Sequence, residues 1–141
     1  MNKLLLVVVW GGLIGGCAAV PKQSTLTPLN LTAHKEAVDD YWITYRKVAP
    51  VYPQQAKNDK ISGCVEFSLL IDVNGRAVEP TIIKAFPEGV FDEQAAIAIR
   101  KWLWVPTKTN TERQPVLTTI QHDFVVRNSQ NAKAAYDVCK I

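Results

Sequence analysis

Side chains that could act as nucleophiles, bases or metal ligands are few and scattered in this 141-residue chain. Cys64 has no histidine in a motif relation to it, so a nucleophilic cysteine is not expected. His122 stands beside Asp123, but the only other histidine, His34, is far away in the sequence and no metal-ligand spacing results. The adjacent carboxylates Asp39-Asp40 would point apart on a helix and cannot act as a pair. The sequence therefore predicts no enzyme, no metal site and no cofactor.

Trp102 and Trp104 could suggest ligand stacking, but core packing explains Trp102 better. Trp102 falls on the apolar stripe of an expected helix, so we predict that it packs in the core. His122 lies among apolar neighbours of an expected strand, and we predict a hydrogen-bonded histidine at the edge of the core rather than a ligand.

The first 16 residues have the three-part layout of an export signal. Leu4 to Ile14 is almost wholly apolar but shorter than the roughly 20 residues of a membrane-spanning helix. Ile14-Gly15-Gly16-Cys17 resembles the lipobox of bacterial lipoproteins, in which small residues admit the peptidase and the thiol accepts the lipid. We predict a lipoprotein signal peptide at 1–16 and lipidation at Cys17, with an ordinary signal peptide or a poor membrane helix as the alternatives.

The remaining two cysteines form an even pair once Cys17 is assigned to the lipid. In an oxidising envelope compartment such a pair predicts a disulfide between Cys64 and Cys139, with two unpaired thiols as the alternative.

The composition is that of one small globular domain: 48% of the residues are apolar, 21% are charged and the formal net charge is +3. Lys and Arg form no run, so nucleic acid is not an expected partner. Residues 17–47 are predicted to be a tether. Its second part fits either a helix over 32–45, capped by Thr32, or a strand at Tyr41–Tyr45.

Strict alternation of apolar side chains from Cys64 to Asp72 predicts a half-buried strand. Asn74-Gly75 predicts a hairpin turn, followed by a second strand from Arg76 to about Ala85. Pro80 cannot donate to a central ladder, so the second strand is expected at a sheet edge.

Helices and a third strand complete the predicted domain over residues 48–127. The expected elements are a short helix at Pro53–Asp59, a helix at Phe91–Leu103, a strand at Val116–Val126, and in the tail 128–141 a short helix at Ala132–Ala135. The prediction is an α+β two-layer domain with a three-stranded antiparallel sheet and two helices.

Several short motifs follow one another between Val48 and Val126, at the positions Tyr52, Pro53, Gly63, Gly75, Phe91, Trp102 and Pro106. No single motif is specific, but their order and spacing together resemble the C-terminal domain of the TonB family. The resemblance implies a periplasmic module that binds an extended segment of an outer-membrane receptor by adding it to the edge of the last strand.

The strand order inferred from Pro80 also leaves the third strand as a sheet edge. Between Leu117 and Val126 only Asp123 is charged and no proline occurs, and an unprotected edge indicates use in pairing. The partner is a receptor-like peptide segment or a second copy, unless the tail from Asn128 covers the strand. The predicted partner-binding residues are Leu117, Thr118, Thr119, Ile120, Gln121, His122, Asp123, Phe124 and Val125.

Departures from the family pattern shape the predicted function. The apolar run 4–14 is too short to span a membrane. About 30 residues separate Cys17 from Val48, and they reach about 100 Å at full extension. Ala49 stands where well-studied members of the family have glutamine. We therefore expect a lipid-anchored binding module on the periplasmic face, at the outer membrane because Ala18 follows the cysteine. The alternatives are a divergent energy transducer for siderophore or vitamin uptake, and a structural envelope lipoprotein that self-associates.

Overall fold

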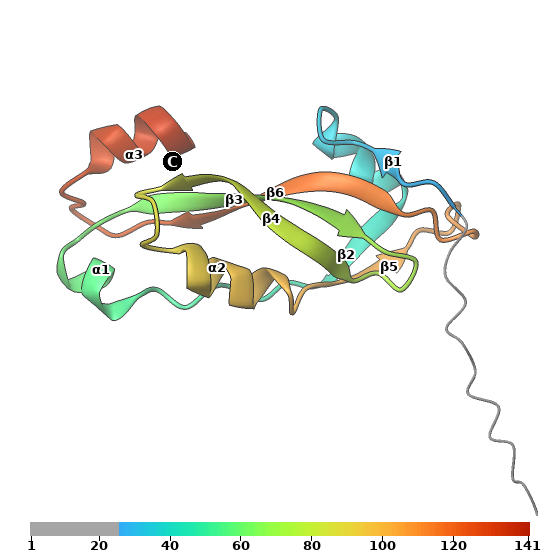
Figure 1. Ribbon diagram of the computed structural model, residues 1–141, viewed down its shortest axis with the longest axis horizontal. Coiled ribbons are helices and arrows are strands. Elements are labelled where there is room, and N and C mark those ends of the chain that lie inside the picture. Colours follow the sequence, from blue (N-terminus) through green and yellow to red (C-terminus); the bar gives the residue numbers. More distant parts are fainter. Residues whose placement is uncertain (1–25) are drawn as a thin grey trace, which may run out of the picture.

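The computed structural model describes residues 26–141, so the predicted signal peptide and Cys17 lie outside the described residues. Figure 1 shows an elongated α+β domain built around one twisted sheet. The elements in chain order are β1 (Leu29–Asn30), the 3-10 helix η1 (Lys35–Asp40), β2 (Trp42–Arg46), α1 (Gln54–Asn58), β3 (Gly63–Ile71), β4 (Ala77–Phe86), α2 (Asp92–Ile99), β5 (Leu103–Pro106), β6 (Val116–Phe124) and α3 (Ala132–Cys139).

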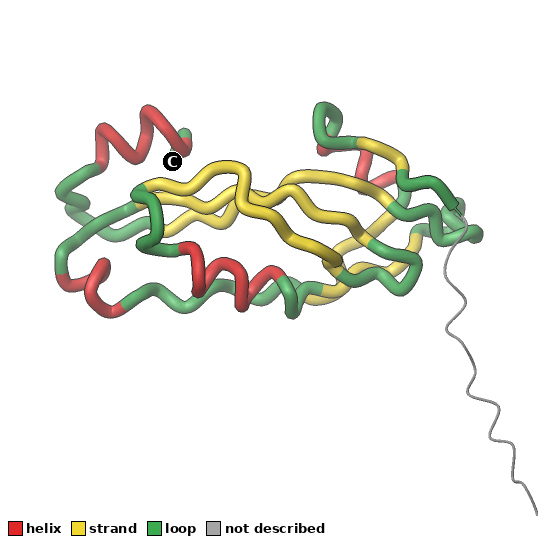
Figure 2. Tube along the Cα trace, viewed as in Figure 1, coloured by secondary structure: helices red, strands yellow, loops and turns green. Residues whose placement is uncertain are grey.

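The main sheet has four strands in the order β1-β6-β3-β4. Figure 2 draws the strands in yellow, with helices beside them in red. β3 is central and pairs antiparallel with both β4 and β6, and β4 is an edge strand, as Pro80 required. The α+β class is confirmed, but the prediction of three strands is wrong. β1, from the predicted tether, adds a parallel pairing of Leu29 with Val116 and of Asn30 with Leu117.

A second, two-stranded sheet joins β2 and β5; it decides one alternative that the sequence left open and corrects one predicted helix end. The helix over 32–45 is not formed, since a 3-10 turn is followed by the strand that was the alternative. α2 ends at Ile99, not Leu103, because Leu103–Pro106 pairs with β2 instead. Leu-Trp-Val is a sequence that favours strands over helices, and the pairing supplies its backbone hydrogen bonds.

The core lies between β3 and α2 and extends to both ends of the sheet. Its aromatic end contains Phe91 and Phe124, whose rings stack 4.2 Å apart, with the Tyr52 ring edge-on to both. Trp102 is 5% exposed and its indole N–H donates to the Val48 carbonyl, which confirms its predicted core position. Each large apolar side chain buried in this way stabilises the fold by about 1.5–3 kcal/mol.

The hairpin between β3 and β4 forms as predicted, but through the longer loop 72–76. The Asp72 carboxylate accepts backbone N–H bonds from Asn74 and Arg76, at 2.9 Å each, and so closes the loop. Gly75 alone in this loop has a positive φ, of +69°.

The opposite face of the sheet is covered at its two ends, by α3 at one and by η1 at the other (Figure 1). The predicted tail helix is present and extends to Cys139. Cys64 and Cys139 are joined by a disulfide with a Cα–Cα distance of 5.8 Å, so α3 is fastened to the face of β3.

Candidate partner-binding edge

The outer edge of β6 is defined by the direction of its backbone groups. The carbonyls of Pro115 and Leu117 accept hydrogen bonds from the β1 segment. The backbone N–H and C=O groups of the odd-numbered residues of this strand are therefore directed away from β3. N–H and C=O groups alternate in direction along a strand. Thr119, Gln121 and Asp123 therefore direct their backbone groups outward, and no strand among the described residues pairs with them.

β1 changes the prediction that β6 is a free edge along its whole length. Leu29 and Leu31 donate backbone hydrogen bonds of 2.9 and 2.8 Å to the start of β6, so that part of the strand is paired. Leu117, the first predicted binding residue, is therefore occupied by β1, and Thr118, Ile120, His122 and Phe124 bond inward to β3. The open stretch is the shorter segment Thr118–Asp123, which we call the open β6 edge.

A cavity of about 490 Å³ lies beside the second half of the open β6 edge. It separates Gln121–Asp123 from the segment Lys47–Pro50, which includes Ala49. A smaller cavity of about 190 Å³ lies beside Thr118–Ile120, with Trp104 and Thr44 in its lining. The edge thus borders a depression that can accept side chains of an added strand.

His122 forms part of this depression, but its imidazole is 5% exposed. Its ring stands edge-on to Trp102 and Phe67, with centroids 5.4 and 6.2 Å apart. Nε2 is buried without a hydrogen-bond partner among the described residues, so the predicted hydrogen bond is not found there. Burial lowers the pKa of His122, the Lys47 charge lowers it further, and Asp123 opposes both.

On the face of the main sheet that is turned away from α2, an ion-pair cluster joins η1 to the sheet beside the open β6 edge. Lys35 and Lys84 lie 2.7 and 3.0 Å from the two carboxylate oxygens of Glu66, and the Thr119 hydroxyl donates to the same carboxylate at 3.1 Å. Burial alone would raise the pKa of Glu66, but the two lysines outweigh it and lower that pKa to about 2. The carboxylate therefore stays ionised and holds the segment before β2 in place.

The C-terminal tail lies over the sheet face rather than along the open β6 edge. α3 packs against β3 and β4, and the Gln121 amide donates to the Cys139 carbonyl at 3.0 Å. The predicted possibility that the tail covers the edge strand is therefore not what the structure shows.

The motif positions are distributed through the scaffold. Gly63 is packed so tightly that a Cβ would lie 1.8 Å from the Phe86 carbonyl oxygen and 2.8 Å from the Phe91 ring. The Tyr52 hydroxyl donates to the Ile61 carbonyl. Pro53 is the N-cap residue of α1, which begins at Gln54. These residues build the core and turns, and none of them lies on the open β6 edge.

The sequence reasoning missed the residues that wrap around the start of β6. Leu31 is buried, the Trp42 indole donates to the Gln114 carbonyl, and Lys35 binds Glu66. The alternation Leu29-Asn30-Leu31 is the one signal for β1, and three residues are too few to identify a strand.

Residues 26–141 contain no group of three His, Cys, Asp or Glu side chains that could hold a metal ion. In the same part of the chain, no helix has the length and apolar character needed to cross a membrane.

Comparison with known proteins gives a family and related structures. The family model described as Gram-negative bacterial TonB protein C-terminal matches residues 48–126. Protein TonB of Vibrio cholerae serotype O1 is 26% identical over 86 residues, which cover 61% of this chain and 35% of that protein. The chain thus spans about a third of the length of this curated relative.

Two solved structures are similar at 22% sequence identity. The solution NMR structure of the Pseudomonas aeruginosa TonB CTD gives a TM-score of 0.54 and covers 76% of this chain and 100% of its own. A structure from the molecular characterization of the TonB2 protein of Vibrio anguillarum gives a TM-score of 0.48, covering 91% and 100% respectively. The family match covers more than half of the chain, and the α+β fold with β3 between β4 and β6 agrees with it. The chain therefore belongs to the TonB C-terminal family.

Proposed function

We propose that this protein is a binding module rather than an enzyme, and that a partner segment adds as a strand to the open β6 edge. The observation that carries this proposal is the outward direction of the backbone groups of Thr119, Gln121 and Asp123, with no paired strand in the described part of the chain. Backbone hydrogen bonds would supply affinity, and the adjoining cavities would select the partner's side chains. A receptor-like peptide segment is the proposed partner, and a second copy is the rival.

The proposed location is the periplasmic face of the cell envelope, with a lipid on Cys17. β1 begins at Leu29, only 12 residues after Cys17 by subtraction of the residue numbers. Twelve residues reach about 40 Å when fully extended. A tether of this length keeps the domain close to the membrane that carries its lipid. This supports an anchor in the outer membrane, next to the proposed receptor, over an anchor in the inner membrane from which the domain would have to cross the periplasm.

The binding test is a proline at Gln121 of the full chain, with Gln121→Ala as the matched control. Both variants lose the side-chain bond to Cys139, but only proline removes the outward N–H. Gln121→Pro should keep its circular dichroism spectrum and melting transition, because edge positions tolerate proline. Proteins cross-linked to the open β6 edge in intact envelopes, identified by mass spectrometry, should be lost in Gln121→Pro and retained in Gln121→Ala. Unchanged cross-linking of a folded Gln121→Pro protein would rule out strand addition.

The anchor has a separate test. Labelled palmitate should enter the wild-type protein and should be absent from Cys17→Ser. Equal labelling of the two proteins would end the lipoprotein assignment without affecting the edge.

Energy transduction is the second candidate function, favoured by the similarity to Protein TonB of Vibrio cholerae. The matched region covers 35% of that relative, so its whole activity is a proposal here. Loss of siderophore or vitamin uptake on deletion, restored by the wild-type chain but not by Gln121→Pro, would favour this role.

A further inference from the structure

The small β2–β5 sheet carries exposed apolar side chains on the face turned away from the core. Ile43 and Val105 are cross-strand partners and are 53% and 39% exposed, while Trp42 and Trp104 beside them are buried. Tyr45, at the irregularity in the pairing, is 73% exposed. Exposed apolar groups that adjoin one another mark an interaction surface more often than isolated ones do.

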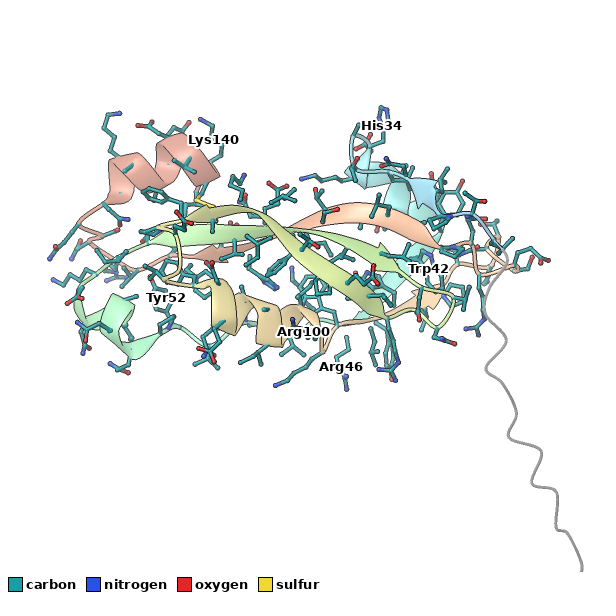
Figure 3. All side chains as sticks on the ribbon, viewed as in Figure 1. His34, Trp42, Arg46, Tyr52, Arg100 and Lys140 are labelled. Carbon is teal, nitrogen blue, oxygen red and sulfur yellow. A yellow bond between two sulfur atoms is a disulfide. The ribbon has the colours of Figure 1, made fainter. Side chains whose placement is uncertain are left out.

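Basic side chains adjoin these apolar groups at the end of α2. Arg46, Arg100 and Lys101 are all exposed, and none forms an ion pair with another residue of the described range 26–141. The Arg46 guanidinium donates to the Lys101 carbonyl at 3.0 Å, which brings the end of β2 to the end of α2. Figure 3 shows Arg46 and Arg100 on the same side of the molecule, opposite α3. We call this surface the basic-apolar patch; it consists of Ile43, Tyr45, Arg46, Arg100, Lys101 and Val105.

The chemistry of the basic-apolar patch matches an anionic bilayer surface. Clustered Lys and Arg are attracted to anionic phospholipid headgroups, and each cation strengthens this attraction about fivefold. Tyrosine is enriched at membrane interfaces, where its ring lies among the headgroups and its hydroxyl stays hydrated, and exposed aliphatic groups insert beside it. A protein partner would need an acidic surface with an apolar centre, whereas a membrane offers both features at once.

The short tether supplies a second argument. Leu29 lies 12 positions after Cys17, which allows about 40 Å of travel, close to the diameter of about 35 Å expected for a domain of this size. A domain confined in this way meets the membrane at an effective concentration of about millimolar order, so a weak surface affinity is sufficient.

We propose that the basic-apolar patch docks on a phospholipid surface containing anionic headgroups. This docking deepens the proposed lipid-anchored location and rests on it. The patch shares no residue with the open β6 edge, so a docked domain can still bind a partner segment.

The test uses the full lipidated chain in phosphatidylcholine vesicles, with and without phosphatidylglycerol. The probe is a photoactivatable phosphatidylglycerol, or its phosphatidylcholine counterpart in the neutral vesicles, and the labelled peptides are mapped by mass spectrometry. Labelling should concentrate in the peptides that contain Tyr45 and Val105, and only in the anionic vesicles. Arg46→Glu combined with Lys101→Glu should lower it at least about tenfold, from the per-cation effect above.

Matched controls separate the patch from general attraction. Lys57→Glu combined with Arg127→Glu makes the same charge change at exposed positions without ion pairs in the described chain, and should leave the labelling unchanged because salt screens charges beyond about 10 Å. Tyr45→Ser should reduce acyl-chain labelling while the fold is retained. The mass of the N-terminal peptide reports the lipid at Cys17 independently. Three results with an anchored protein would overturn the docking proposal. They are uniform labelling along the chain, equal labelling in neutral and anionic vesicles, and an equal loss of labelling in the control pair and the patch pair.

Discussion

Cys64 and Cys139 are bonded across 75 residues of sequence, and both side chains are buried between β3 and α3. The bond fastens the C-terminal helix to the sheet face that α2 leaves uncovered. At the other end of α3, Asn131 exchanges two hydrogen bonds with the Ser62 backbone, and Ala135 is buried, while the outward side chains Tyr136 and Val138 are 58% and 41% exposed. An oxidising environment therefore adds a covalent attachment to the C-terminal end of the last helix.

Reduction of this bond should lower the free energy of unfolding by about 4 kcal/mol in the chain-entropy model, less any strain. Urea unfolding of the oxidised protein and of Cys64→Ala/Cys139→Ala would measure the loss, with Cys17→Ser as a cysteine variant that keeps the bond. Hydrogen exchange in 132–139 should accelerate first. Two free thiols titrated in unreduced, denatured protein would contradict the bond.

The Glu66 cluster predicts acid sensitivity in a defined pH range. The folded-state pKa of about 2 is lower than the ordinary value of 4.5, so the stabilisation is complete above pH 4.5 and is lost as the pH falls towards 2. Glu66→Gln should cost on the order of 2 kcal/mol at neutral pH and flatten the stability profile between those values. Chemical unfolding at several pH values would test this, with the exposed Glu88→Gln as control. A wild-type profile in Glu66→Gln would show that the two lysines contribute little.

The long strands could be predicted because their side chains alternate over eight or more residues. β3 and β6 bury one face, and that periodicity is visible in the sequence. The second edge of the main sheet could not be predicted in the same way. β1 has two residues, and what identifies it is its pairing with Val116 and Leu117, which lie more than 80 residues away.

β5 shows how tertiary pairing can override a helical pattern. Trp102 belongs to the apolar stripe that favoured a helix through Leu103. In the structure the Trp104 amide donates instead to the Gly75 carbonyl at 2.9 Å, and Ile43 and Thr44 pair with Val105 and Trp104. Trp104 and Val105 do favour strands, but nothing local reports their contacts with Gly75 and β2, so the helix end was predicted four residues too late.

The candidate site was predicted in part. Pro80 correctly marked β4 as an edge, and β6 has an open stretch. The sequence could not show which backbone groups face outward, because that depends on the register with β3. The ion pair from Lys35 to Glu66, joining residues 31 positions apart, was also invisible without the fold.

His122 predicts a second pH dependence, nearer neutrality. Its folded pKa lies below the ordinary 6.5, so the stabilisation is complete above pH 6.5 and declines as the pH falls, because the unfolded chain takes up the proton first. The decline is limited to about 1.4 kcal/mol per pH unit for one proton. The charged groups that act on the imidazole are Lys47 and Asp123, with opposite effects.

His122→Gln should remove this decline between pH 6.5 and 5, measured as the urea midpoint at each pH. The exposed His34→Gln is the matched control and should follow the wild-type profile. An unchanged profile in a folded His122→Gln protein would show that the buried imidazole is not the titrating group.

The last prediction separates two effects of adding a methyl group to a glycine. Gly75 and Gly89 both have positive φ, of +69° and +77°. A Cβ at Gly75 would lie 2.0 Å from the Trp104 carbonyl oxygen, whereas a Cβ at Gly89 would have no atom within 4 Å. Gly89→Ala should therefore lower the free energy of unfolding only by the penalty of placing alanine in the left-handed conformation, about 1–2 kcal/mol.

Gly75→Ala should cost a further 1–3 kcal/mol, about the penalty of overpacking, because the hairpin loop and β5 must separate. The Trp42 indole, which lies 3.3 Å from this Cβ position, and Trp104, whose backbone carbonyl must move, should then change their fluorescence, and Gly89→Ala should leave it unaltered. Trp104 also lines the cavity beside Thr118–Ile120, so partner binding at the open β6 edge should weaken in Gly75→Ala alone. Equal destabilisation of the two variants would mean that the hairpin loop moves away from β5 at no cost in free energy. The hydrogen bond from the Trp104 N–H to the Gly75 carbonyl would then not hold β5 against the loop.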